Sequence, residues 1–148
     1  MKFGESLRRL LPGVWLGLLA AIAFLAMPAA FHALDRASAG TLAREMFAWE
    51  ARVSLAFGAL LLVIERRAGL EHHLATGASQ FTVPMMLLLG ALFCTVAGYY
   101  GLLPAMETLR AGGTASLDFG QLHALSTAFF GAKGLFVLVL AWRATRLK

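Results

Sequence analysis

Residues 119–142 read FGQLHALSTAFFGAKGLFVLVLAW and contain one charged side chain, Lys133. A helix needs about 20 mostly apolar residues to cross the hydrocarbon core of a bilayer, so this stretch is long enough to span a membrane. Towards the N-terminus, three further runs of this kind occupy residues 81–104, 46–64 and 13–34. The sequence therefore predicts four transmembrane helices.

The composition agrees with a membrane protein. Hydrophobic residues make up 59% of the chain, charged residues 14%, and the mean hydropathy is +0.74, whereas a soluble domain carries about 25% charged residues. Residues 1–148 are too short for two domains of this kind. We therefore expect a single all-α domain, an integral membrane four-helix bundle that has the lipid bilayer as its surroundings.

The distribution of basic residues predicts how the bundle is oriented. Lys and Arg are concentrated on one side, with eight in the N-terminus, second connection and C-terminus: Lys2, Arg8, Arg9, Arg66, Arg67, Arg143, Arg146 and Lys148. The other two connections hold three: Arg36, Arg44 and Arg110. The positive-inside rule then predicts up-down-up-down topology with both termini cytoplasmic. Because the basic residues lie at helix ends, the net charge of +5 points to lipid headgroups and not to nucleic acid.

Small residues recur at every fourth position in each predicted helix. The longest series lies in the last helix, and shorter ones lie in the others: Gly120, Ala124, Ala128 and Ala132; Gly13, Gly17 and Ala21; Ser54 and Gly58; Ala97 and Gly101. Such ridges let helix backbones approach one another closely in a membrane. We expect each of them to pack against another helix.

The two hairpins also echo each other. Pro28 is followed by Ala39-Gly40-Thr41, and Pro104 is followed by Gly112-Gly113-Thr114. A duplication would give parallel repeats of two helices each, although similar hairpins in similar lipid look alike by default.

Charged residues within a membrane span are costly, so Glu50, Arg52 and Lys133 each require an explanation. Glu50 and Arg52 are two positions apart and cannot share a helix face, so we expect Glu50 to point into the bundle and Arg52 towards the headgroups. Lys133 should be buried and directed towards Glu50, with about 10 Å between them in depth that a water molecule or a hydroxyl group could bridge. Further polar side chains, from every predicted helix, fall near the non-cytoplasmic end, and this asymmetry is the strongest functional indication in the sequence. The predicted ligand-binding set is His32, Asp35, Glu50, His123, Ser126 and Lys133.

These residues suggest several functions. The first is binding of a ligand, an ion or a partner protein through the polar cluster at the non-cytoplasmic end, without catalysis, since no nucleophile–base pair is evident. The second is a metal site formed by His32, Glu50 and His123, or a haem held between the two histidines. The third is a small transporter subunit that acts as a homo-oligomer. The two histidines can also simply hydrogen-bond near the interface, so no cofactor is assigned.

The chain also resembles a known family. The residues that carry the resemblance are Val14-Trp15-Leu16-Gly17, Pro28, Phe31, Ala39-Gly40, Phe119, Leu122-His123 and Ser126. They resemble a bacterial four-helix membrane-protein family of unknown function that is related to eukaryotic transmembrane protein 205. The resemblance covers almost the whole chain, does not include Lys133, and implies a multi-pass protein of the bacterial inner (plasma) membrane. It implies no established activity.

Overall fold

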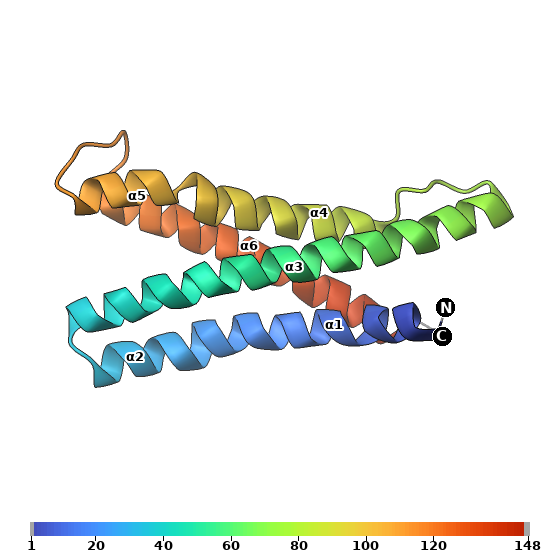
Figure 1. The fold of residues 1–148 in the computed structure, drawn as a ribbon, viewed down its shortest axis with the longest axis horizontal. Helices are drawn as coiled ribbons and strands as arrows, with labels where there is room; N and C mark the ends of the chain where they lie inside the picture. Colours follow the sequence, from blue (N-terminus) through green and yellow to red (C-terminus); the bar gives the residue numbers. More distant parts are fainter. Residues whose placement is uncertain (1, 147–148) are drawn as a thin grey trace.

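The computed structural model describes residues 2–146 and contains four long helical spans (Figure 1). The first span comprises α1 (Lys2–Ala21), a short π-helical segment η1 (Ile22–Ala26) and α2 (Met27–Ala33), and the second is the single helix α3 (Arg36–Thr76). The third comprises α4 (Val83–Thr95), the π-helical segment η2 (Val96–Gly101) and α5 (Leu103–Arg110), and the fourth is α6 (Phe119–Ala144). The described chain contains no strand, so the all-α class is confirmed.

The helix ends are set by local chemistry. The side chain of Asp35 accepts hydrogen bonds from the backbone N–H groups of Ala37 and Ser38 and so caps α3, and Thr82 caps α4 in the same way. Asp118 and Gln121 form a reciprocal capping box at the start of α6. At its other end α3 stops at Gly77, whose φ of 71° suits glycine best.

The first two connections are shorter than the sequence suggested because α3 is longer, and the third is shorter because α5 continues to Arg110. α3 begins at Arg36 and not near residue 46, and it continues to Thr76, well past residue 64. The predicted loop over residues 65–80 is therefore mostly helix, and the second connection is 77–82. A helix of 41 residues is about 60 Å long, roughly twice the hydrocarbon thickness of a bilayer.

The four spans form an up-down-up-down bundle, with the beginning of α1 and the end of α6 at the same end (Figure 1). α1 packs against α3 and α6, and α4 also packs against α3 and α6. α3 and α6 therefore face each other across the bundle. The hydrophobic core draws on all four spans: Trp15, Leu19, Leu61, Leu88, Ala91, Val137 and Leu140.

The outer surface of the bundle carries many large apolar side chains. All four spans are long and apolar enough to cross a membrane, and only 17% to 28% of their most apolar windows is buried inside the chain. Large exposed side chains such as Phe24, Phe93 and Leu135 suit contact with lipid tails. These features indicate a multi-pass membrane protein.

Only one of the predicted small-residue ridges lies in the core. Ser54 and Gly58 are buried, and a Cβ at Gly58 would overlap the side chain of Leu92 on α4. The longest ridge does not pack as expected, because Gly120, Ala124 and Ala128 are exposed. The buried face of α6 is instead formed by larger residues and one lysine: Leu122, Lys133, Val137, Leu140 and Ala144. The ridge of α1, Gly13, Gly17 and Ala21, is exposed as well.

Candidate functional site

Glu50 and Lys133 form an ion pair in the interior of the bundle. The Lys133 Nζ donates to Glu50 Oε1 over 2.6 Å, and the two residues are only 3% and 4% exposed, respectively. Glu50 belongs to α3 and Lys133 to α6, the two helices that face each other across the bundle. The pair therefore joins opposite sides of the four-helix arrangement.

A third helix is connected to the pair through Ser54. Ser54 lies one turn after Glu50 on α3, and its hydroxyl donates to Glu50 Oε1. The indole Nε1 of Trp15 on α1 donates to Ser54 Oγ over 2.9 Å. Ser54 and Trp15 are fully buried. A chain of hydrogen bonds thus runs from α1 through α3 to α6.

The ammonium of Lys133 has an aromatic neighbour on its own helix. Its Nζ lies 4.8 Å from the ring centroid of Phe130, a geometry that stabilises a cation. Phe130 packs edge to face against Phe47 of α3, with ring centroids 5.5 Å apart. Glu50 is the only hydrogen-bond acceptor of Lys133 among residues 2–146, whereas an ammonium has three donors. The ammonium can therefore donate to a further polar group.

The orientations expected from the sequence are confirmed at this pair. Glu50 points inward, and Arg52 is exposed with its guanidinium carbon 5.0 Å from the ring centroid of Trp49. Lys133 is buried and reaches Glu50. The expected depth difference of about 10 Å is wrong, because α3 begins at Arg36. With that start, Glu50 and Lys133 lie equally far along their helices.

The other predicted site residues do not join this pair. His32 and Asp35 are exposed at the α2–α3 connection, where Asp35 caps α3. His123 is exposed and stacks on Phe119 of its own helix, with ring centroids 6.4 Å apart. Ser126 is half-buried and forms no hydrogen bond with Lys133.

The structure thus corrects the expectation that His32, Glu50 and His123 converge. Glu50 lies about 21 Å along α3 from its first residue, whereas His32 lies at the end of α2 and Asp35 immediately before α3. Within the described part of the chain, no group of three or more His, Cys, Asp or Glu residues could hold a metal ion.

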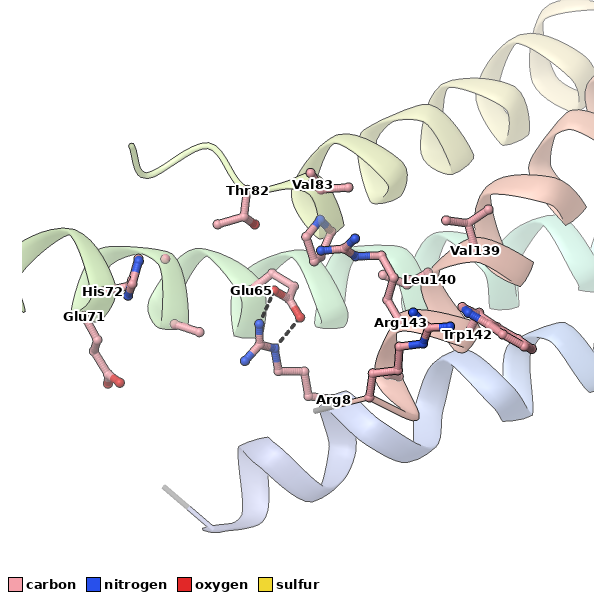
Figure 2. Close-up of a pocket in the computed structure, with 15 residues that line it drawn as sticks. Arg8, Glu65, Glu71, His72, Thr82, Val83, Val139, Leu140, Trp142 and Arg143 are labelled. Carbon is pink, nitrogen blue, oxygen red and sulfur yellow. Dashed lines mark hydrogen bonds and ion pairs between the residues drawn. The ribbon is translucent and has the colours of Figure 1, made fainter. Parts of the chain in front are cut away.

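A second buried acidic residue lies towards the end of the bundle where α1 begins and α6 ends. Glu65 is 3% exposed and forms a two-point ion pair with Arg8 of α1, in which Arg8 Nη2 lies 2.8 Å from Glu65 Oε2 and Arg8 Nε contacts Oε1 (Figure 2). From the sequence, Glu65 was expected at the start of a loop, and its pair with Arg8 was not predicted. Helical periodicity could have revealed it, because the buried positions Ser54, Gly58, Leu61, Glu65 and Gly69 follow each other at intervals of three or four along α3.

The fold and the charge pair define a four-helix, multi-pass membrane protein with a polar centre. Residues 10–115 match a domain of unknown function, DUF4149, and the chain belongs to this family. The match includes Glu50 and ends before α6, which carries Lys133. No curated protein and no solved structure matches the chain.

Proposed function

We propose that this protein binds a small polar ligand or an ion at the Glu50–Lys133 pair, in the middle of the membrane-spanning bundle. The observation that carries the proposal is the burial of both charges at a point where the ammonium has a single acceptor among residues 2–146. Ionisable residues within membrane spans are rare and commonly mark the paths or sites of polar ligands.

Three features of the pair support a binding role. The carboxylate supplies acceptors and the ammonium supplies donors at one place. A small polar molecule could therefore replace one member of the pair as the partner of the other. The hydrogen bond from Ser54 holds the carboxylate when the ammonium moves. Phe130 offers the ammonium a second favourable contact during such an exchange.

We further propose that the protein resides in a bacterial inner membrane with both termini in the cytoplasm. The excess of arginine at the end of the bundle where α1 begins and α6 ends supports this orientation. Polar residues near the α2–α3 and α5–α6 connections would then face the other side and form the approach to the pair; His32, Asp35 and His123 are among them.

The test compares the protein with a variant that lacks both charges, Glu50→Gln/Lys133→Met. Removing both partners avoids an unpaired buried charge, so the variant should fold. Thermal unfolding of both proteins in mild detergent is followed against rising sodium chloride, potassium acetate and choline chloride. We expect at least one salt to raise the Tm of the unmodified protein, with an increase that grows with the salt concentration as the site fills. The same salt should leave the Tm of the double variant unchanged.

The matched control is Arg52→Gln, which removes an exposed charge two positions from Glu50 on α3. This variant should keep the full salt response. A response of equal size in the double variant would mean that the salts act elsewhere, and the absence of any response in the unmodified protein would contradict the proposal.

A further inference from the structure

A pocket of about 900 Å³ opens at the end of the bundle where α1 begins and α6 ends. It lies between α1, the far part of α3, the start of α4 and the last turns of α6 (Figure 2). Gly69 of α3 makes room for the chain here, because a Cβ at this position would lie 2.9 Å from the backbone oxygen of Gln80. The 77–82 connection therefore lies close against α3, and the first turn of α4 forms one wall.

The pocket is lined by more basic than acidic side chains. Arg8, Arg143 and Arg146 line it together with Glu65 and Glu71, so arginines outnumber carboxylates by three to two. Glu65 is already engaged by Arg8 at both of its oxygens. Arg143 has no carboxylate partner among residues 2–146, and Arg146 lies over the ring of Trp142. Guanidinium groups with free donors of this kind bind phosphate oxygens well.

The remaining walls favour an anion that carries an apolar part. Thr82, which caps α4, and Val83 in the first turn of α4 also line the pocket, and the N-terminal end of a helix is electrostatically favourable for a negative charge. Val139 and Leu140 form an apolar wall deeper along α6. Trp142 is 61% exposed beside them, as expected of an aromatic residue at the headgroup level of a membrane.

From this combination we propose that the pocket binds the phosphate of an anionic phospholipid headgroup. Arg143 and Arg146 contact the phosphate, and Val139 and Leu140 contact the start of the acyl chains. Basic pockets between membrane helices are a recurrent form of lipid recognition. This inference concerns the opposite end of the bundle from the approach to the Glu50–Lys133 pair and does not depend on that pair.

The test measures lipid binding to the detergent-purified, delipidated protein by native mass spectrometry. Phosphatidylglycerol is compared with phosphatidylcholine and with inorganic phosphate, for the unmodified chain and for Arg143→Gln/Arg146→Gln. We expect phosphatidylglycerol to bind the unmodified chain about tenfold more tightly than phosphatidylcholine, and the double variant to lose this preference. Both arginines are exposed, so the variant should keep its helical content and Tm.

The control variant is Arg66→Gln/Arg67→Gln. It removes two exposed charges from α3, between the lining residues Glu65 and Ala68, without altering a residue that lines the pocket. It should retain the preference for phosphatidylglycerol within about twofold, because neither arginine lines the pocket and each adds only the general attraction of a basic residue near the membrane surface. An equal loss in both double variants would show general surface attraction and overturn the proposal. Binding of inorganic phosphate without any lipid preference would identify a site for free phosphate and would also overturn it.

Discussion

Glu50 and Lys133 lie at equal distances along the helices that carry them. Each is fourteen residues from the first residue of its helix (36 to 50 and 119 to 133), and both helices begin at the same end of the bundle. The two side chains therefore meet at one depth, about 21 Å from those helix starts. Because the two residues lie at one depth, a single ion pair can connect the two helices that face each other across the bundle.

Removal of one member of the pair should destabilise the bundle more than removal of both. Lys133→Met leaves Glu50 as a buried charge without its partner, which costs about 3–5 kcal/mol in comparable pairs. Glu50→Gln/Lys133→Met should recover most of that loss. Thermal unfolding in detergent measures the difference. If the single and double variants unfold at the same temperature, the two charges do not stabilise each other.

Close packing of η2 on α6 should make Gly98 intolerant of a side chain. A Cβ at Gly98 would overlap Phe129, whereas a Cβ at Gly134 meets no atom within 4 Å. We expect Gly98→Ala to destabilise the protein by about 1–3 kcal/mol because of overpacking. Gly134→Ala, in the middle of α6, should be neutral or stabilising, since alanine is the better helix former. Equal effects of the two changes on the Tm would contradict this packing.

The exposed small-residue face of α6 should accept larger side chains. Ala128 is exposed, whereas Ala91 of α4 is 1% exposed in the hydrophobic core. We therefore expect Ala128→Leu to leave the Tm unchanged and Ala91→Leu to lower the free energy of unfolding by about 1–3 kcal/mol. A large loss with Ala128→Leu would show that this face packs against another chain in the purified protein.

Cysteine labelling tests the topology on intact cells. Ser79 lies in the 77–82 connection, and Ser116 lies in the connection between α5 and α6, at the opposite end of the bundle. A membrane-impermeant maleimide should label Ser116→Cys from outside and label Ser79→Cys only after permeabilisation. The unmodified chain is the control, because its Cys94 is buried. The reverse pattern would place both termini outside the cytoplasm.

The cap at Asp35 should make α3 sensitive to acid. Hydrogen bonds from the side chain and backbone of Ser38 lower the pKa of Asp35. A carboxyl group whose pKa is lower in the folded state stabilises that state above its unfolded pKa, and the stabilisation disappears as the pH falls through the folded value. Asp35→Ala should therefore lower the Tm at neutral pH and have less effect in strong acid. An identical decrease at both pH values would mean that the ionised cap contributes nothing.

The sequence was sufficient to predict the four spans, the up-down order and the burial of Lys133, because long apolar runs and isolated charges have few solutions in a membrane. The bounds of α3 were missed, since its polar ends continue as helix beyond the bilayer-length apolar run. The exposed ridge of α6 was missed because alanine and glycine suit lipid-facing and buried positions alike. The Arg8–Glu65 pair depends on where α1 lies beside α3, which is a tertiary relationship.

The two π-helical segments have a mechanical consequence. η1 and η2 interrupt the first and third spans, each a few residues before a proline, Pro28 or Pro104, whereas α3 and α6 are continuous. Such interruptions are the usual points at which helices bend. Both charges of the central pair are carried by the unbroken helices. Bending at η1 and η2 would thus move α2 and α5 at one end of the bundle. The Glu50–Lys133 pair would meanwhile keep α3 and α6 connected in the middle.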